Sequence, residues 1–377
     1  MSPCRVGVAI GLGLALCMSG LTQAADAPAG APDAACDLDL ELMVQPVPPQ
    51  GVFREAGYHI WCCTLTRGDD GKYHIFYSRW PLELHHRAWV THCEVAHAVG
   101  DSSLGPFKFS DVALPARGAP YWDGSCTHNP TVFRGRDGKY YLYHMGNTGD
   151  GKDVVPLNTV HRNNQRIGVA IADSPYGPWK RFDKPALDVS AAPEAPDALM
   201  VSNPAVTERP EGGYLMIYKG VSRPSDAHPR GVVSFFVATG DKPGGPFKKH
   251  LKEVMSEAQL GVVTEDPCVW RGADRYWCIM RLNGTAVRQD TGTYRFSREG
   301  KSLVLFESFD GLDWSPAKHA HIVDLNMKWE GEKKLQPICI ERPQIYLENG
   351  KPAVLICAST EKPKNVDGSF DIFIPLR

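Results

Sequence analysis

The sequence of 377 residues has almost no net charge, because 41 Lys and Arg side chains are balanced by 43 Asp and Glu side chains. A protein that binds a phosphate backbone needs a basic excess, so nucleic acid is excluded as the main partner. Beyond residue 21 the chain also lacks an apolar run long enough to cross a bilayer, and we expect no membrane span in the mature protein. Composition therefore indicates a globular protein with another kind of ligand.

Cysteine is present, but no two cysteines have C-x-x-C spacing, which argues against a zinc ribbon or a thioredoxin-type site. Of the eleven cysteines, Cys4 and Cys17 lie in the N-terminal segment, so nine remain and at least one is unpaired. Most of the nine lie in apolar, strand-like runs, where a buried free cysteine behaves as a small hydrophobe. The sequence leaves open whether one or two disulfides form.

The N-terminal segment has the pattern of a signal peptide. Arg5 precedes an apolar run, Val6–Leu21, that is too short for a comfortable membrane span, and small residues follow it up to Ala24. We therefore predict a signal peptide over residues 1–24, a flexible tail over residues 25–36 and a folded domain over residues 37–377. The protein would be exported to the periplasm or the extracellular space. The alternative is an uncleaved anchor.

Thirty prolines and 36 glycines disfavour a helical bundle and indicate a chain rich in strands and turns. Four segments repeat one pattern: a polar pair, a proline, a short β-branched or aromatic strand, a turn with Gly and a second apolar strand. This is the signature of a β-hairpin. A fifth, degenerate copy has Trp61-Cys62 in place of the polar pair and lacks the proline. The four complete copies begin at Thr127, Val201, Thr264 and Ile340.

A second repeated element follows each of the first four hairpins, as a strand, a tight turn and an aromatic residue that can fill the space between neighbouring sheets. The aromatic residues are Phe107, Trp179, Phe247 and Trp314. Five units of about 68 residues suit four-stranded blades with long loops. We predict an all-β fold, a five-bladed β-propeller, closed by Leu38–Val47 or Phe370–Leu376 because an open edge is a liability. A β-sandwich or two smaller β domains is the alternative, which a fivefold repeat disfavours.

These repeated strand starts and turns resemble the five-bladed β-propeller glycoside hydrolases, a superfamily that includes families 43, 32 and 117. The resemblance implies a glycosidase of an oligosaccharide or polysaccharide, with carboxylates at the inner strand starts. It implies an Asp base, a second Asp and a Glu acid as in family 43, or a His acid as in family 117. This chain departs from that pattern, because Cys62 and Asn129 stand where carboxylates would be. Either the roles have moved to blades four and five, or catalysis is lost.

Propeller geometry indicates where catalytic residues would lie, since the innermost strands converge on one axis and their first residues meet at one mouth. Glycoside hydrolysis needs two carboxyl groups, one protonated and one ionised. The predicted catalytic residues are Asp266, Glu341, Glu265 and, in the loop before blade two, Asp123. Each has a structural alternative: Asp-Pro is a common turn starter, Glu341 could simply pair with Arg342, and a loop acid such as Asp123 is often only solvated.

The predicted substrate-binding residues combine strand-start polar groups with aromatic residues. Arg342 would clamp a sugar in bidentate fashion. His92 and Glu94 alternate on one strand, and the repeat places Arg166 in the position of Glu94. The tryptophans suit sugar faces, or else fill space between blades. The full set is His128, Arg342, Asn129, Asn203, His92, Glu94, Arg166, Trp80 and Trp122.

His128 has several open roles: a proton donor, a substrate contact, a structural hydrogen bond or a metal ligand. No cofactor is required for the predicted reaction, but the resemblance implies that a structural calcium ion could lie on the propeller axis beside His128. An ordered water in the same position is the alternative.

The sequence therefore predicts an exported glycoside hydrolase that acts on the end of an oligosaccharide, with inversion as the outcome that the family 43 resemblance implies. Two other functions stay open. One is a catalytically silent propeller that binds carbohydrate, and the other is a glycoside phosphorylase, which would need a basic pocket for phosphate.

Overall fold

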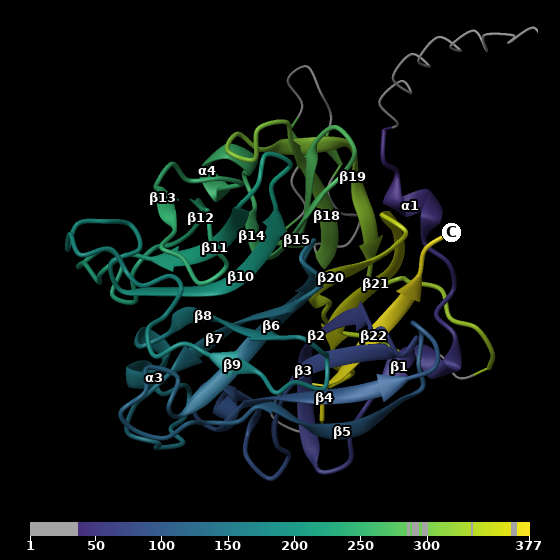
Figure 1. Cartoon of the computed structure of the whole chain (residues 1–377). Helices are drawn as coiled ribbons and strands as arrows, with labels where there is room; N and C mark the ends of the chain where they lie inside the picture. The colour runs from purple at the N-terminus through teal and green to yellow at the C-terminus, as the bar shows by residue number, and fades with distance from the viewer. Residues whose placement is uncertain (1–36, 285–286, 289–293, 296–300, 333–334, 363–367) are drawn as a thin grey trace, which may run out of the picture. The chain divides into compact units, whose positions relative to one another are not determined.

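The computed structural model describes residues 37–284, 287–288, 294–295, 301–332, 335–362 and 368–377. The predicted signal peptide over residues 1–24 and tail over residues 25–36 lie outside these ranges. Within them, five antiparallel sheets of four strands each form a ring (Figure 1), which confirms the five-bladed β-propeller. A small sheet of β16 (Val287–Arg288) and β17 (Tyr294–Arg295) is inserted in blade four.

The first three blades follow the chain in order, each from the innermost strand outwards. Blade one consists of β2 (Tyr58–Arg67), β3 (Tyr73–Pro81), β4 (Glu94–Gly100) and β5 (Phe107–Leu114). Blade two consists of β6 (Cys126–Arg134), β7 (Tyr140–Asn147), β8 (Arg166–Ala172) and β9 (Lys180–Arg181). Blade three consists of β10 (Met200–Glu208), β11 (Tyr214–Val221), β12 (Val233–Gly240) and β13 (Lys248–His250).

Blades four and five complete the ring. Blade four consists of β14 (Val263–Arg271), β15 (Tyr276–Asn283), β18 (Lys301–Ser308) and β19 (Ser315–Asp324). Blade five consists of β20 (Glu341–Glu348), β21 (Lys351–Ser359), β22 (Phe370–Pro375) and β1 (Val52–Phe53).

Blade five is built from both ends of the domain, because β1 pairs with β22 and Val52 lies opposite Ile372. The predicted closing segment Phe370–Leu376 supplies the third strand of the blade. The fourth strand comes from Val52–Phe53, a few residues beyond the other predicted segment, Leu38–Val47. That segment instead contains the helix α1 (Leu40–Met43) and a bridge from Val44 to Leu376. The two ends together cover the edge that an open ring would expose.

The helices of the described chain are single turns, of which the longest is α3 (Thr159–Asn163). The 3-10 turn η2 (His86–Ala88) and α2 (Trp89–His92) lie between β3 and β4, and α3 lies between β7 and β8. The remaining turns are η1 (Pro49–Gly51) and α4 (Glu257–Leu260). None of these described helices has the length and apolar character that a membrane crossing requires.

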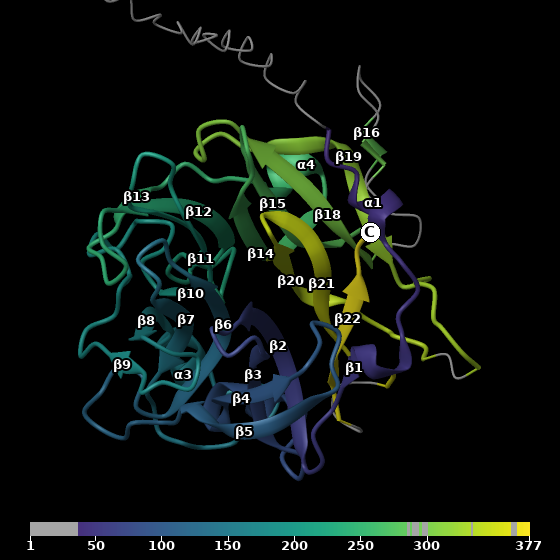
Figure 2. The same cartoon turned by 45° about the vertical axis from the view of Figure 1, so that its right-hand side comes forward.

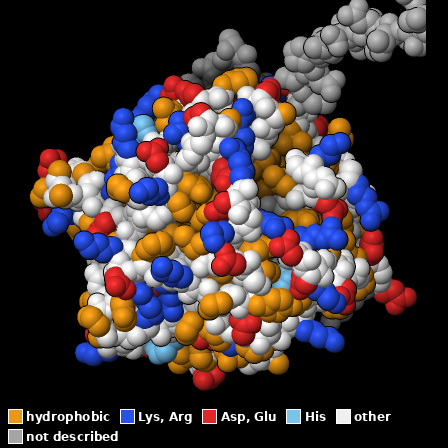
Figure 3. All heavy atoms as spheres, in the orientation of Figure 1, with side chains coloured by type: hydrophobic (Ala, Val, Ile, Leu, Met, Phe, Trp, Pro, Cys, Tyr) orange, Lys and Arg blue, Asp and Glu red, His pale blue; other side chains and the backbone are white. Residues whose placement is uncertain are grey.

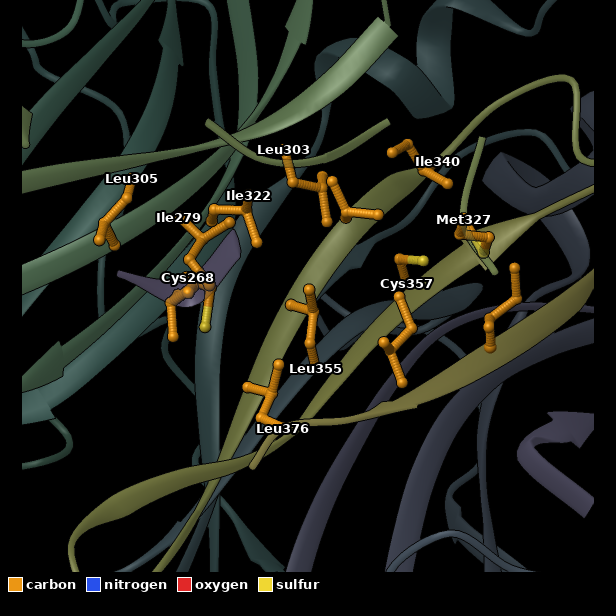
Figure 4. Close-up of a cluster of buried hydrophobic side chains, with 14 of the residues drawn as sticks. Cys268, Ile279, Leu303, Leu305, Ile322, Met327, Ile340, Leu355, Cys357 and Leu376 are labelled. Atoms are coloured by element: carbon orange, nitrogen blue, oxygen red, sulfur yellow. The ribbon is translucent and has the colours of Figure 1, made fainter. Parts of the chain in front are cut away.

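Hydrophobic side chains fill the spaces between neighbouring blades. Figure 4 shows such a cluster between blades four and five, where Ile279 and Leu305 face Leu355 and Cys357. The repeated aromatics pack at such seams as predicted: Phe107 between blades one and five, Trp179 between one and two, Phe247 between two and three, and Trp314 between three and four. All eight described cysteines are buried, in line with their strand-like sequence context.

Charged side chains of both signs are interspersed on the face that Figure 3 shows, without a continuous field of either sign. This distribution agrees with the near balance of charge in the sequence.

Candidate active site

The five innermost strands, β2, β6, β10, β14 and β20, contact one another in sequence around the centre of the ring (Figure 2). Each has a β-bulge where its pairing with the next strand shifts register. One non-glycine residue in every bulge adopts the left-handed conformation, which costs roughly 1–2 kcal/mol and is kept where a bulge must aim a side chain. These residues are Cys62, Asn129, Asn203, Asp266 and Arg342, with φ of 61°, 53°, 52°, 62° and 54°.

The five bulge residues meet at one mouth of the propeller, where the sequence placed them. The Cys62 thiol donates to Asn129 Oδ1 over 3.0 Å, Asn129 Nδ2 donates to Asn203 Oδ1 over 2.7 Å, and Asn203 Nδ2 donates to Asp266 Oδ1 over 2.9 Å. Arg342 Nη1 donates to the same Asp266 oxygen over 3.3 Å. All five residues are buried. The amides of Asn129 and Asn203 are thus committed to this axial chain of hydrogen bonds.

A cavity of about 420 Å³ opens above the axial chain, and three carboxylates line it. Glu265 Oε1 accepts a hydrogen bond of 2.7 Å from Lys219 Nζ, and its other oxygen pairs with Arg281. Arg281 also reaches Glu341 Oε1 over 3.2 Å and lies 3.5 Å from Asp266 Oδ2. One guanidinium on β15 therefore ties together carboxylates from blades four and five.

The cations decide the protonation of Glu265. Burial alone would raise the pKa of this carboxyl, but Lys219 and Arg281 outweigh burial and hold the pKa below its ordinary value. Conversely, burial lowers the pKa of Arg281, while Glu265, Asp266 and Glu341 raise it by more. At neutral pH, Glu265 is ionised and Arg281 is charged.

His128 lies against the same cavity, packed between two tryptophans. Its ring centroid is 4.8 Å from that of Trp89 and 5.9 Å from that of Trp80. Its Nδ1 lies 2.5 Å from Asn129 Oδ1 and carries the proton there, whereas Nε2 is buried without a partner in the described chain. Burial, with a contribution from Arg342, lowers the pKa of His128 to about 3. The imidazole is therefore neutral, which suits a hydrogen-bond acceptor for a ligand hydroxyl.

The axial residues fit a calcium ion poorly. Calcium takes six to eight oxygen ligands, but the side-chain oxygens of Asn129, Asn203 and Asp266 already accept hydrogen bonds, and the Arg342 guanidinium lies against Asp266. Across the ranges that the structure covers, no group of three or more His, Cys, Asp or Glu residues could hold a metal ion. We therefore derive no role for a metal beside His128.

Asp123 lies in the packing of blade two and does not line the cavity. Its carboxylate is fully buried and pairs with Arg117 over 2.6 Å and Arg181 over 3.1 Å. Burial raises the pKa of Asp123, but His144 and the two arginines outweigh burial and lower it to about 2. This corrects the expectation of a catalytic role, because the carboxylate is occupied by arginines of its own blade.

Trp122 is likewise a packing residue of blade two. Its ring stacks on His144 with centroids 5.6 Å apart, in space that Gly146 and Gly168 leave free, since a Cβ on either glycine would come within 2.6 Å of the indole. The expected sugar-stacking role is therefore corrected for Trp122. Trp80 does line the cavity, although its side chain is buried.

Three further expected ligand-binding residues lie outside the cavity. His92 is exposed at the end of α2, Glu94 pairs with Arg79 over 2.9 Å, and Arg166 pairs with Asp188 over 2.5 Å. The repeat alignment of Arg166 with Glu94 is confirmed, because they begin the third strands β8 and β4. A third strand lies two strands away from the axis, which is why neither side chain reaches the mouth.

Sequence reasoning missed the two cations that hold the carboxylates. Lys219 and Arg281 lie on second strands, directly opposite the first residues of their polar pairs, Ser202 and Glu265. Pairing the two strands of each predicted hairpin residue by residue would have identified both cations from the sequence. The other cavity residues not predicted as ligands are Trp61, His86, Arg87, Trp89, Leu157, Arg162, Gln165 and Met200.

The class that this fold defines is the five-bladed β-propeller. No family model matches the chain, and no curated protein matches it in sequence. Among solved structures, a complex of BT0996 and RGII is 15% identical over 89% of this chain and 92% of that protein, with a TM-score of 0.62. Zg3597, a family 117 glycoside hydrolase from the marine bacterium Zobellia galactanivorans, is 15% identical over 89% and 92% of the two proteins, with a TM-score of 0.57.

A thermostable family-43 glycoside hydrolase is 13% identical over 88% of this chain and 91% of that protein, with a TM-score of 0.54. At such identities the likeness establishes the fold. The resemblance to five-bladed propeller glycoside hydrolases that the sequence indicated is confirmed at that level.

Proposed function

We propose that the protein is a glycoside hydrolase whose reaction takes place in the cavity at the axial mouth. The observation that carries this proposal is the convergence of Glu265, Asp266 and Glu341 on one cavity whose other lining residues are mostly aromatic or hydrogen-bonding. Glycoside hydrolysis needs an ionised and a protonated carboxyl on either side of the scissile bond. The solved structures named as family 117 and family 43 glycoside hydrolases share the fold and support the proposal.

The contacts favour Glu265 as the ionised carboxylate, and we assign the role of proton donor to Glu341, the carboxyl that enters the same cavity from blade five. Both bind Arg281, so they share one guanidinium, but Glu265 also binds Lys219. Glycoside hydrolysis needs one ionised and one protonated carboxyl, and Lys219 and Arg281 keep Glu265 ionised. Glu341 is then left to supply the proton that the leaving oxygen needs, while Glu265 activates water or stabilises the cationic transition state.

Asp266 is better suited to positioning. Its Oδ1 accepts from Asn203 and Arg342, and its Oδ2 accepts from the Arg342 backbone N–H over 3.2 Å. These bonds hold the guanidinium of Arg342 at the floor of the cavity. The negative charge of Asp266 there would also favour the oxocarbenium-like transition state.

Several buried polar atoms of the cavity are without a hydrogen-bond partner in the described chain. They are Trp80 Nε1, His128 Nε2, and Nε and Nη2 of Arg342. A buried polar group without a partner costs about 1–3 kcal/mol, so such groups normally meet water or a ligand. A hydroxyl-rich sugar supplies both donors and acceptors for these atoms.

We further propose that the enzyme is exported and acts on chain ends. The apolar run Val6–Leu21 supports export. Two connections border the cavity, residues 82–93 and residues 148–165, and His85 Nε2 of the first lies 2.7 Å from Asp153 Oδ1 of the second. Such a link favours a pocket for one chain end over an open cleft.

The test is a screen of purified protein against plant and algal glycans, with released sugars identified by chromatography and mass spectrometry. We expect mono- or disaccharide release from one class of glycan, and its loss in Glu341→Gln. Tight glycan binding with no release would favour the silent carbohydrate-binding propeller, whereas turnover that requires inorganic phosphate would favour a phosphorylase. Either result would contradict hydrolysis.

A second measurement tests the assignment of Glu265. Arg281→Gln removes a cation that lowers the pKa of Glu265, so the acidic limb of the kcat/KM profile should move to higher pH. Arg281→Lys keeps the charge and serves as the matched control. An acidic limb that stays in place in Arg281→Gln would show that Glu265 is not the ionised carboxylate.

A further inference from the structure

The charges around the cavity do not balance. Three acidic residues line it, Glu265, Asp266 and Glu341, against five basic residues, which are Arg87, Arg162, Lys219, Arg281 and Arg342. The overall chain carries a slight negative charge, so this positive excess is a local property of the site.

Three of the five cations are already used by the carboxylates. Lys219 binds Glu265, Arg281 bridges Glu265 and Glu341, and Arg342 binds Asp266. Arg87 and Arg162 form no ion pair with any carboxylate of the described residues. The surplus charge of the cavity therefore resides in these two side chains.

Arg162 is held in place without a counterion. It lies on α3, and its Nη1 donates to the Arg230 carbonyl and to Asn163 Oδ1, over 3.0 Å each. Burial lowers the pKa of Arg162, and the neighbouring Arg230 cation lowers it further. A half-buried guanidinium fixed by neutral acceptors and close to a second cation gains most from an anion that enters with the ligand.

Arg87 and Arg162 line the cavity from other blades than the carboxylates do. Arg87 belongs to η2 in the connection after β3, and Arg162 belongs to the connection after β7, so both come from blades one and two. Glu265 and Glu341 lie near the starts of β14 and β20, the innermost strands of blades four and five. A sugar bound with its scissile bond at the carboxylates would share this cavity with the two arginines, which could then contact its other substituents.

We propose that this cavity selects a glycan whose terminal sugar carries an anionic group, a carboxylate or a sulfate, and that Arg87 and Arg162 bind that group. The proposal rests on the proposed glycosidase function and adds its substrate class. Arginine presents paired N–H donors that match both oxyanions, and charge-assisted bonds of this kind are about twice as strong as neutral ones.

The test is a binding measurement by calorimetry, with oligogalacturonates, glucuronate-terminated oligosaccharides and sulfated galactan oligosaccharides as probes. Each probe is paired with its neutral counterpart, made by carboxyl reduction or desulfation. We expect one anionic probe to bind the wild type about tenfold to a hundredfold more tightly than its neutral counterpart, as charge-assisted hydrogen bonds predict. The class of probe that shows this preference distinguishes a carboxylate from a sulfate.

Variants assign the preference to residues. Arg87→Gln and Arg162→Gln should each remove most of the preference, measured as the ratio of the affinities for a probe and its neutral counterpart, and Arg162→Lys should retain part of it. Arg136→Gln, an exposed arginine paired with Glu208 outside the cavity, is the matched control and should change nothing. Because Arg87 is exposed and its side chain makes no structural bond in the described chain, Arg87→Gln keeps the test valid if Arg162→Gln loses stability.

Equal affinity for each probe and its neutral counterpart would overturn the proposal, and so would the absence of binding by every anionic probe. Turnover that depends on inorganic phosphate would also overturn it, because the arginines would then serve a co-substrate. Binding does not require hydrolysis. An anionic preference without sugar release would thus refute the hydrolase and leave this inference standing, whereas hydrolysis without anionic preference would do the reverse.

Discussion

The axial residues of blades one to three and those of blades four and five share one backbone and differ in chemistry. All five are left-handed bulge residues at the same mouth. Cys62, Asn129 and Asn203 are neutral and bind one another, whereas Asp266 and Arg342 are charged and bind each other. The same bulge therefore occurs in all five blades. The side chain at the bulge determines whether a blade provides a structural hydrogen bond or a charged group to the site.

The difference extends to the residues before the bulge. Blades one to three place Trp61, His128 and Ser202 there, and blades four and five place Glu265 and Glu341. Lys219, on blade three, contributes the cation that faces Glu265 across the blade boundary. The carboxylates of the cavity thus come from two adjacent blades, while blades one and two supply its aromatic walls.

The largest effect should come from removing a charge in the reactive half. Glu341→Gln should lower kcat/KM by about two to four orders of magnitude, because a general acid contributes that much to rate. Its melting temperature should stay near that of the wild type, since the side chain lies at a cavity wall. If Glu341→Gln kept more than about a tenth of the wild-type kcat/KM, the loss would be too small for a general acid. The axial carboxylates would then not be the reactive half of the axis.

A stability effect should come from Asp123, the carboxylate that lies in blade two away from the cavity. Asp123→Ala leaves Arg117 and Arg181 without their buried partner, and breaking a buried pair in this way costs about 3–5 kcal/mol. The measurement is chemical denaturation, together with kcat/KM per folded molecule, which should not change. Asp173→Ala is the control, because its pair with Lys139 is exposed and worth about 0–1 kcal/mol.

If Asp123→Ala were instead as stable as Asp173→Ala and had lost its activity, Asp123 would belong with the reactive residues after all. The two variants remove the same group, so the comparison isolates the effect of a buried, multiply paired carboxylate against an exposed one with a single pair.

A pH effect should come from Asp371, a carboxylate at the seam of blades one and five. It is buried, and no cation of the described residues pairs with it; its Oδ1 accepts from the Cys63 N–H over 3.4 Å. Burial raises its pKa from 3.8 to about 7. The folded state then holds the proton more tightly than the unfolded state, so unfolding free energy should fall as pH rises from about 4 to about 7 and level off above that.

Asp371→Asn should remove that part of the pH dependence, which denaturation at a series of pH values measures. The contrast with Glu265 is direct, because cations lower one pKa and their absence leaves the other raised. An unchanged pH profile in Asp371→Asn would mean that the Asp371 carboxyl is solvated in the folded state.

The repeat predicted the architecture and the axial residues because both follow from spacing alone. The polar pair and its proline recur in phase with the blades, so Asn129, Asn203, Asp266 and Arg342 could be superposed before any coordinates were known. Cys62 could be added although its copy lacks the proline. Ring closure was harder to predict, since β1 has only two residues and carries no copy of the repeat.

Other features of the site depend on contacts that no repeat encodes. Lys219 and Arg281 sit within apolar second strands, and only the hairpin register brings them opposite Ser202 and Glu265. Arg87 and Arg162 lie in connections of unequal length, whose path over the mouth is set by tertiary packing. Asp123 was mistaken for a cavity residue because the arginines that bury it lie up to 58 residues away in sequence.

The smallest effect should come from the neutral half of the axis. Cys62→Ser keeps a donor for Asn129 Oδ1, so its unfolding free energy should stay within about 1 kcal/mol of wild type, the worth of one hydrogen bond, and kcat/KM should not change. Cys62→Ala removes that donor and should be less stable than Cys62→Ser by a similar amount. Denaturation and steady-state kinetics on the two variants distinguish a structural thiol from a reactive one.

If Cys62→Ser kept its stability and lost activity by more than about tenfold, equivalent to 1.4 kcal/mol, blade one would take part in the chemistry. The axial residues of all five blades would then contribute to the reaction, and the charge of an axial side chain would no longer indicate whether its blade takes part.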